Sequence, residues 1–312
     1  MPPKAVPALK TAAHIPAQKD VPAAPSIRRF AREIGIEISR VPGTGPGGRI
    51  SIEDIKNYAK QLNTGMASGT GMAVKQLPDF SKWGDVERQP MSKIRAVTAE
   101  NLSYCWQTIP HVTQVGKADI TELEKLRKKF STNDRKLTIT PFLLKVMASA
   151  LKIFPQFNAS IDMNTKEIIF KKYVHIGIAV DTDRGLLVPV LKDVDKKSIL
   201  EINAEVTAIA ERARDKKITL DELRGACITL TNLGGIFGNS FTPIINWPEV
   251  AILGVSRSQW EPVLENNQFV PRLMCPLSLS YDHRLIDGAD GARFLKWVCE
   301  AIENPFILEL GE

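Results

Sequence analysis

A strand, a turn and a helix near the C-terminus constrain the fold of this chain more than any other feature. An apolar run over residues 273–279 predicts a buried strand. The next segment, 281–288, reads Tyr-Asp-His-Arg-Leu-Ile-Asp-Gly, and apolar side chains recur at helical spacing over residues 288–301. His283 follows the strand directly and Asp287 lies four residues later. A histidine beside a carboxylate that can orient it suits proton abstraction near neutral pH.

Length and composition indicate a globular protein with about two domains. The chain has 312 residues, of which 44% are hydrophobic and 24% are charged, so it can build a sizeable core. No apolar stretch approaches the roughly 18 residues of a membrane span. The first twenty residues lack the apolar centre of a secretion signal, and their prolines would break the helix of an organelle presequence. We therefore expect a cytoplasmic protein with no membrane contact.

Cysteine, histidine and charge patterns exclude further classes of protein. The four cysteines are widely spaced, and with only four histidines no metal-ligand spacing emerges, so we expect reduced, buried thiols and no metal. The net charge of +6 could favour an acidic partner surface or nucleic acid. Because no nucleic-acid-binding motif accompanies that charge, we expect no nucleic-acid partner.

Two segments of low complexity divide the chain. Residues 1–23 are rich in Ala, Pro and Lys, whereas residues 62–78 are rich in Gly, Ser and Thr without apolar periodicity. Such compositions are typical of linkers. The sequence therefore predicts a small domain at 24–61 and a large domain at 79–312. A flexible arm between them would raise the local concentration of whatever the small domain holds.

Residues 24–61 read as two short helices around a structured loop. Ser26 is a candidate cap for the first helix, Gly35 ends that helix, and Ser51 opens the second. The Gly/Pro-rich loop 41–49 lacks both a Gly-Lys-Ser/Thr ending and a preceding strand, which disfavours phosphate binding. Basic residues outnumber acidic ones in this unit. From the residues alone, they form either a solvated basic face or a surface for an acidic partner.

The small unit closely resembles the peripheral subunit-binding domain of the acyltransferase components of 2-oxo acid dehydrogenase complexes. The matching segments are Pro-Ser-Ile-Arg-Arg-Phe-Ala-Arg-Glu, Gly-Thr-Gly-Pro-Gly-Gly-Arg-Ile and Glu-Asp-Ile. The resemblance implies that Arg28, Arg32 and Arg49 bind acidic residues on a decarboxylating 2-oxo acid (pyruvate) dehydrogenase or on dihydrolipoamide dehydrogenase. Arginine forks against carboxylates suit a small, charge-driven interface.

Strands alternating with helices over residues 79–312 predict an α/β (α+β) domain with a mixed sheet. Its second notable stretch is 228–235, where a strand delivers the hydroxyl of Thr231 into a glycine-rich loop. A neutral histidine can take the proton of a thiol, and a hydroxyl can stabilise the oxyanion that forms when the thiolate attacks a thioester. Spacing alone leaves open that Thr231 is only a strand-end residue.

This domain resembles the catalytic domain of dihydrolipoyl acyltransferases. The shared segments include Thr-Leu-Thr-Asn-Leu-Gly-Gly, Phe-Thr-Pro-Ile-Ile-Asn, Pro-Glu-Val-Ala-Ile-Leu-Gly-Val-Ser and Tyr-Asp-His-Arg-Leu-Ile-Asp-Gly, in the family's order. The resemblance implies a chloramphenicol acetyltransferase-like fold and homotrimers that assemble into a core of 24 or 60 chains. It assigns His283 as general base, Asp287 as its supporting carboxylate and Thr231 as oxyanion donor, with base and donor coming from neighbouring chains.

Further segments resemble the bacterial, pyruvate-type acetyltransferase, namely Pro-Asp-Phe-Ser-Lys-Trp-Gly at 78–84 and the run at 287–294. The implied reaction moves an acetyl group from S-acetyl-dihydrolipoyl-lysine to coenzyme A. Thr231 stands where many members have Ser and where succinyl-transferring members have Thr, so succinyl or branched-chain acyl transfer stays open.

The family normally carries a lipoyl domain, whose lysine lies in an Asp-Lys-Ala turn. This sequence contains no such turn: its Lys117-Ala118 pair follows Gly116, not Asp, and belongs to a predicted strand of the large domain. We therefore expect the lipoyl group to be carried on a domain absent from this chain, either on another chain or on a part of the natural protein that the given sequence lacks. Two other functions compete with acetyl transfer to coenzyme A. One is a non-catalytic docking scaffold, which would be expected to lose the histidine or the hydroxyl. The other is acetylation of a small molecule, for which the docking domain has no use. The residues that bind coenzyme A are not assigned.

Overall fold

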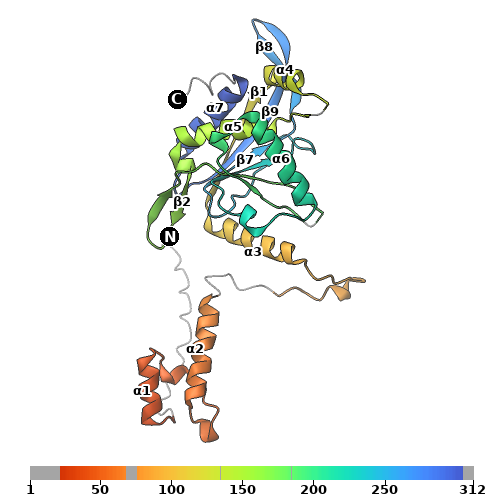
Figure 1. Cartoon of the computed structure of the whole chain (residues 1–312). Helices are drawn as coiled ribbons and strands as arrows, with labels where there is room; N and C mark the ends of the chain where they lie inside the picture. Colours follow the sequence, from red (N-terminus) through yellow and green to blue (C-terminus); the bar gives the residue numbers. More distant parts are fainter. Residues whose placement is uncertain (1–21, 68–75, 134, 184, 305–312) are drawn as a thin grey trace, which may run out of the picture. The chain divides into compact units, whose positions relative to one another are not determined.

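The computed structural model describes residues 22–67, 76–133, 135–183 and 185–304 (Figure 1). It divides the chain into two compact units, Met1–Arg88 and Gln89–Glu312. The predicted linker 1–23 lies largely outside the described residues, as do residues 68–75 of the linker predicted at 62–78, so the predicted domain boundaries stay predictions.

The first unit contains two helices around a small apolar core. Helix α1 spans Pro25–Glu33, helix α2 spans Ile52–Ala67, and two short 3₁₀ turns connect them. The predicted cap at Ser26 is wrong. The N-cap is Ala24, because Pro25 takes the first helical position and needs no hydrogen-bond acceptor there. Helix α2 also runs past residue 61, where the sequence predicts that the domain ends. The core consists of Ala31, Val41, Ile50 and Ile55.

The Gly/Pro-rich loop of the first unit is fixed by one carboxylate. Asp54 accepts hydrogen bonds from the hydroxyl of Thr44 (2.8 Å) and from the backbone N–H and hydroxyl of Ser51 (2.8 and 2.9 Å). These hydrogen bonds, led by that of the Ser51 N–H, lower the pKa of Asp54 to about 2. A Cβ at Gly43 would lie 2.2 Å from the carbonyl oxygen of Gly48, so only glycine fits there. The loop glycines therefore serve chain packing.

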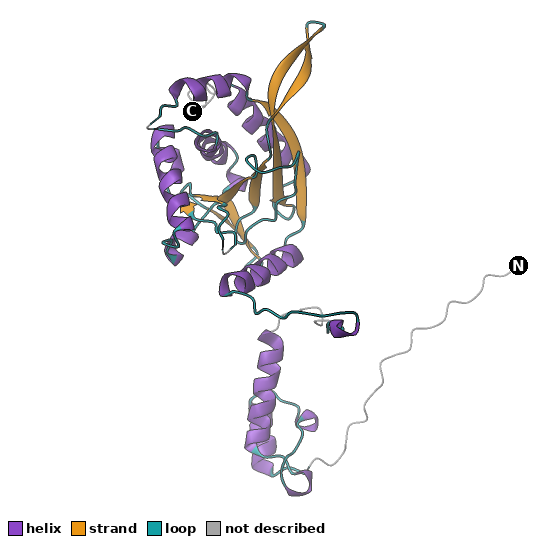
Figure 2. Cartoon of the chain, turned by 90° about the vertical axis from the view of Figure 1, so that its right-hand side faces the viewer, coloured by secondary structure: helices purple, strands orange, loops and turns teal. Residues whose placement is uncertain are grey.

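The second unit has a mixed sheet with helices on its faces (Figure 2). Its helices are α3 (Lys93–Thr108), α4 (Thr121–Phe130), α5 (Thr140–Ile153), α6 (Ile199–Arg214) and α7 (Gly288–Glu303). The strands of the main sheet are β1 (His111–Asp119), β4 (Ile176–Ile178), β5 (Val190–Leu191), β6 (Ile228–Asn232), β7 (Ala251–Val255), β8 (Gln259–Glu265) and β9 (Gln268–Asp282). Their order is β1-β9-β7-β6-β4-β5, with β8 paired to β9.

The pairing confirms the predicted α+β class with a mixed sheet. Strands β4, β6 and β7 run parallel to one another. Strand β9 pairs antiparallel with β1, β7 and β8, and β5 pairs antiparallel with β4. The sequence analysis missed a separate hairpin, β2 (Ala159–Asp162) with β3 (Glu167–Phe170). All four residues of β3 are exposed. Its sequence, Glu-Ile-Ile-Phe, also lacks the alternation of apolar and polar residues from which a half-buried strand is predicted.

The main core lies between the sheet and helices α5 and α7. Leu277, Leu279 and Tyr281 of β9 point into it, and the ring of Phe294 from α7 stacks on that of Phe157 at 4.0 Å. A smaller cluster of Cys105, Ile109, Ile245 and Ile252 packs α3 against the other face of the sheet. Within the described ranges, no helix is long and apolar enough to cross a membrane.

Candidate active site

His283 lies directly after β9, where the backbone holds it from both sides. Its own N–H donates to the carbonyl of Pro110 (3.1 Å), and the N–H of Asp282 donates to the carbonyl of Val250 (2.8 Å). The imidazole is exposed, with the ring of Tyr281 at 6.0 Å. Across the part of the chain that the structure describes, the imidazole has no hydrogen-bond partner. The backbone is thus fixed while the ring is free to meet a substrate.

The two other described histidines have structural partners. His111 Nδ1 lies 2.8 Å from the carbonyl oxygen of Ile109, and its Nε2 accepts from the N–H of Ile245 (3.0 Å). Its ring also stacks on Trp106. His175 Nδ1 accepts from the N–H of Asp193 (3.0 Å). Both are held as hydrogen-bonded packing residues, which leaves His283 as the histidine suited to proton transfer.

The residues on either side of His283 form an ion pair that the sequence analysis missed. The buried carboxylate of Asp282 accepts from Arg284 Nε (2.9 Å) and Nη2 (2.6 Å). It also accepts from the backbone N–H of Arg284 (3.0 Å), which closes the turn around His283. The visible signal was the tripeptide Asp-His-Arg itself, in which opposite charges flank the base.

Asp287 takes the N-cap position of α7, with no hydrogen bond from its side chain to the helix. Its carboxylate is exposed and, among the described residues, makes no hydrogen bond to His283. The turn behind it is packed tightly, because a Cβ at Gly291 would lie 2.5 Å from the ring of Tyr281. Within one chain, therefore, the structure brings Asp287 near the turn of His283 without joining the two side chains.

Thr231 lies at the other end of the sheet from His283. It pairs with Gly254 of β7, and Gly254 pairs with Ser278 of β9. His283 follows five residues after Ser278, which corresponds to roughly 17 Å along the strand and roughly 10 Å across two strand spacings. A base and an oxyanion donor must each come within roughly 3 Å of the same reacting group. The structure therefore does not bring Thr231 and His283 of one chain together.

A buried carboxylate, Glu249, was also missed by the sequence analysis. It precedes β7, is 3% exposed, and accepts from the hydroxyl of Thr229 (2.6 Å) and from Asn246 Nδ2 (3.0 Å). Burial raises the pKa of Glu249 to about 7, with both hydrogen bonds opposing that shift. An acidic residue at the start of a continuous apolar run was the available signal.

The described residues offer neither an activated thiol nor a metal site. Burial raises the pKa of Cys105, Cys227 and Cys275, and that of Cys299 to about 12. All four thiols are therefore poor nucleophiles at neutral pH. Within the described ranges, no group of three or more His, Cys, Asp or Glu side chains is placed to hold a metal ion.

A groove of about 600 Å³ is lined in part by Arg284, the residue that follows His283 in the sequence. Its walls come from α3, from the β2–β3 hairpin and from the segment that precedes β7, and they include Tyr104, Phe170, Trp247 and Arg284. Its lining combines aromatic and aliphatic side chains with charged and other polar ones, and its volume is in the range of sites for small organic ligands.

The arginines predicted to bind a partner are exposed in the first unit. Arg28 and Arg32 lie on α1, one helical turn apart, and Arg49 follows the Gly/Pro-rich loop. Arg28 Nε donates to the carbonyl of Ala23 (3.4 Å). Two other arginines of this unit, Arg29 and Arg40, form ion pairs with Glu33 and Glu37.

Comparisons with known proteins match both units. The family described as 2-oxoacid dehydrogenases acyltransferase (catalytic domain) matches residues 84–310, and the e3 binding domain matches residues 21–56. The dihydrolipoyllysine-residue acetyltransferase component of the pyruvate dehydrogenase complex of Pseudomonas aeruginosa is 48% identical over 91% of this chain. This chain covers 54% of that relative, and it spans about half the length of the curated relatives it first matches.

Two solved structures share the fold of the second unit. The dihydrolipoamide acetyltransferase of Azotobacter vinelandii matches with a TM-score of 0.71 at 47% identity, over 76% of this chain and 100% of that one. A structure of the cubic core of the pyruvate dehydrogenase multienzyme complex matches with a TM-score of 0.71 at 48% identity, with the same coverage. The fold is thus that of acyltransferase catalytic cores. The chain belongs to the family of 2-oxoacid dehydrogenase acyltransferases and carries the family's e3 binding domain.

Proposed function

We propose that this chain transfers an acetyl group from S-acetyl-dihydrolipoyl-lysine to coenzyme A in a complex of the pyruvate dehydrogenase type. The observation that carries the proposal is His283, whose backbone is hydrogen-bonded on both sides while its imidazole is exposed. The relative from Pseudomonas aeruginosa bears the name of this acetyltransferase. The acetyl group is favoured over succinyl or branched-chain acyl groups because this relative and those from Cupriavidus necator and Haemophilus influenzae are all named acetyltransferases.

In the proposed reaction, His283 accepts the proton of the coenzyme A thiol, and the thiolate attacks the acetyl carbonyl carbon. The Thr231 hydroxyl donates a hydrogen bond to the resulting oxyanion. The bond from the acetyl carbon to the dihydrolipoyl sulfur then breaks, and the proton passes from His283 to that sulfur. Transfer is direct, because desolvation raises the pKa of all four cysteine thiols and makes them poor nucleophiles. The groove beside Arg284 would admit one of the two thiol-bearing arms.

Thr231 must come from a second copy of the chain, since it lies roughly 20 Å from His283 within one copy. The Azotobacter vinelandii study concerns a serine, a histidine and an asparagine, the latter two four residues apart. His283 and Asp287 have the same spacing, which supports a positioning role for Asp287 in the assembled protein, with a carboxylate here at the spacing of that asparagine. We further propose that copies assemble first around the active site and then into a larger multi-copy core.

The first unit would bind the other enzymes of the complex through Arg28, Arg32 and Arg49. Its partners would be a decarboxylating pyruvate dehydrogenase and dihydrolipoamide dehydrogenase, in the cytoplasm of a bacterium. The lipoyl group would arrive on a separate lipoyl domain. The exposed guanidinium groups suit carboxylates on such partners.

The test is acetyl transfer between acetyl-coenzyme A and free dihydrolipoamide, compared for wild type and His283→Ala. Loss of a general base should lower kcat by roughly a hundredfold or more. His111→Ala is the matched control, since it removes a histidine that is engaged by Ile109 and Ile245. A His283→Ala rate within a few-fold of wild type would show that the base is assigned wrongly. A non-catalytic scaffold would show no transfer in the wild type.

A further inference from the structure

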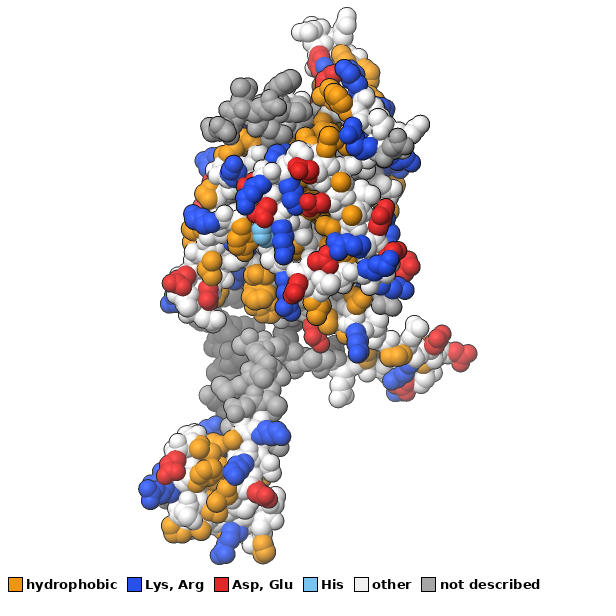
Figure 3. All heavy atoms as spheres, in the orientation of Figure 1, with side chains coloured by type: hydrophobic (Ala, Val, Ile, Leu, Met, Phe, Trp, Pro, Cys, Tyr) orange, Lys and Arg blue, Asp and Glu red, His pale blue; other side chains and the backbone are white. Residues whose placement is uncertain are grey.

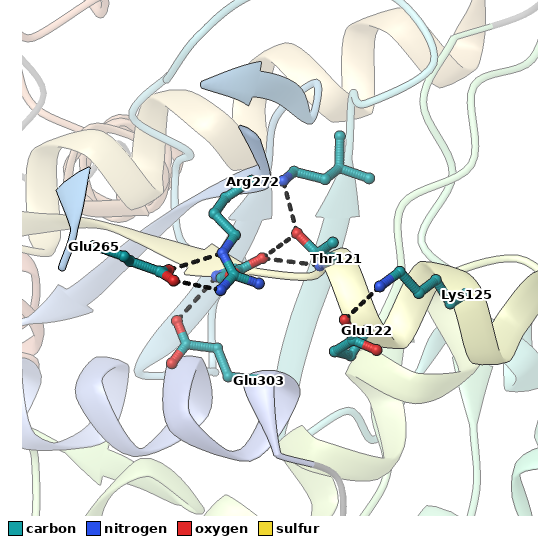
Figure 4. Close-up of polar contacts among 8 residues, drawn as sticks. Thr121, Glu122, Lys125, Glu265, Arg272 and Glu303 are labelled. Atoms are coloured by element: carbon teal, nitrogen blue, oxygen red, sulfur yellow. Dashed lines mark hydrogen bonds and ion pairs between the residues drawn. The ribbon is translucent and has the colours of Figure 1, made fainter. Parts of the chain in front are cut away.

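The buried carboxyl group of Glu249 differs from the carboxylates at the surface of the second unit. Charged side chains of both signs are spread over the face that Figure 3 shows. Among the acidic residues in Figure 4, Glu265 is partly exposed and pairs with Arg272 at 2.7 Å. Glu249, in contrast, is 3% exposed, and both of its hydrogen-bond donors are neutral side chains. Because burying an unpaired carboxyl group costs stability, an apolar side chain would serve a plain packing role better.

The carboxyl group of Glu249 joins three elements. The hydroxyl of Thr229 on β6 donates to its Oε2 (2.6 Å), and Nδ2 of Asn246 donates to its Oε1 (3.0 Å). Asn246 in turn accepts from Nδ2 of Asn101 on α3 (3.3 Å). A Cβ at Gly177 of β4 would lie 2.7 Å from the Thr229 hydroxyl oxygen, so glycine there leaves the room that this hydroxyl needs. The carboxyl group therefore ties the segment before β7 to both β6 and α3.

The segment that Glu249 anchors continues directly into the support of the His283 turn. Val250, the next residue, accepts through its carbonyl from the N–H of Asp282 (2.8 Å). The other backbone hydrogen bond of the turn runs from the N–H of His283 to the carbonyl of Pro110 (3.1 Å). One of the two hydrogen bonds that hold the turn thus ends on the residue adjacent to Glu249.

The groove wall formed by Trp247 and Pro248 has contacts of its own. The carbonyl of Pro248 accepts from the hydroxyl of Ser160 (2.6 Å), and the ring of Trp247 meets that of Tyr104 edge-on at 5.8 Å. Neither contact involves Glu249. Loss of the Glu249 carboxyl group should therefore disturb the turn that follows β9 more than it disturbs the groove.

We propose that Glu249 is a positioning residue for the reaction, which holds the backbone acceptor of the His283 turn through its hydrogen bonds with Thr229 and Asn246. It acts through the backbone and not on the substrate. A base must lie within hydrogen-bond reach of the proton that it takes, and a misplacement of about 1 Å can lower a rate by about a hundredfold. The inference rests on the proposed function, because it concerns the base of that reaction.

The experiment compares Glu249→Ala with Glu249→Gln in the full chain, by acetyl transfer between acetyl-coenzyme A and free dihydrolipoamide. We expect Glu249→Ala to lower kcat at least about tenfold and to change the KM of either substrate by less than about threefold. Glu249→Gln should keep kcat within about threefold of wild type, because its amide can accept from Asn246 and donate to Thr229. Glu122→Ala is the matched control, since it removes an exposed carboxylate that pairs with Lys125 (Figure 4).

Hydrogen exchange, followed by mass spectrometry on the peptide that contains His283, reports on the turn independently of activity. Glu249→Ala should speed the exchange of the N–H groups of Asp282 and His283, whereas Glu249→Gln should leave it as in wild type. Thr229→Val removes the hydroxyl that reaches Glu249 and keeps the shape of the side chain. It provides the same two measurements if Glu249→Ala fails to fold by circular dichroism.

Wild-type kcat and unchanged exchange in the folded Glu249→Ala or Thr229→Val variant would overturn the proposal. A raised KM with unchanged kcat would also overturn it, because Glu249 would then support the groove and not the base. A wild type without transfer activity would refute the proposed function alone, since hydrogen exchange would still decide whether Glu249 holds the turn.

Discussion

The separation of Thr231 from His283 makes a prediction about mixed particles. In the proposed assembly each active site combines the His283 of one copy with the Thr231 of the next. His283→Ala alone should lose roughly a hundredfold in transfer rate. Thr231→Ala alone should lose about as much, as expected for removal of an oxyanion donor. When the two inactive chains assemble together at equal amounts, some sites should receive both intact side chains.

The recovered activity follows from counting. An intact His283 comes only from the Thr231→Ala chain, and an intact Thr231 comes only from the His283→Ala chain. For random mixing in a closed ring, about one quarter of the sites should be intact. If one chain supplied both groups, no mixed particle would recover activity. The roughly 20 Å between the two residues within one copy is what selects the first outcome.

The assay is acetyl transfer by particles co-expressed from the two genes, with different affinity tags and tandem purification to confirm mixing. The matched control mixes wild type with a chain carrying both substitutions. Sites shared between copies predict about one quarter of wild-type activity there too, whereas sites within one copy predict about one half. Recovery that stays at the level of the single variants, in particles proven to be mixed, would refute the shared site.

Two further predictions concern residues behind the site. Burial raises the pKa of Glu249 from 4.5 to about 7, so the folded protein binds this proton more tightly than the unfolded chain, and stability should fall as pH rises from about 4.5 to about 7. The fall in the free energy of unfolding is worth about 3 kcal/mol. Glu249→Gln should remove it when urea unfolding is compared at pH 5 and pH 8, and an equal pH dependence in both proteins would contradict the assignment to Glu249. Gly291→Ala should destabilise the protein by about 1–3 kcal/mol in thermal unfolding, because the added Cβ would lie 2.5 Å from the ring of Tyr281. Gly288→Ala on the same helix is the control, since its Cβ would meet only an atom at 3.9 Å. Equal stability of the two variants would contradict the packing.

Much of the second unit was predictable because its signals are local. The apolar run that ends at His283 is a strand, the segment after Asp287 is a helix, and Ser92 caps α3 through the N–H of Arg95. Each of these follows from periodicity or from a capping residue within a few positions. The cap at Ser26 failed because Pro25, one residue earlier, set the helix start instead.

What could not be predicted depends on pairing between distant segments. The burial of Glu249 arises only when β6 brings Thr229 beside it, and no local pattern reports that. Likewise, the distance between Thr231 and His283 is a property of the register of β6, β7 and β9. The resemblance to a family implied that two chains share the site, whereas the register gives the physical reason.

Strand β9 determines where His283 lies. Along it, alternate residues keep Leu277 and Leu279 in the core, so its register against β7 is fixed by burial. At its C-terminal end, the strand fixes where the turn presents His283. A slip of one residue would move Leu277 and Leu279 out of the core and displace the histidine with them. The proposed base is therefore positioned by buried side chains that lie a few residues before it in the sequence.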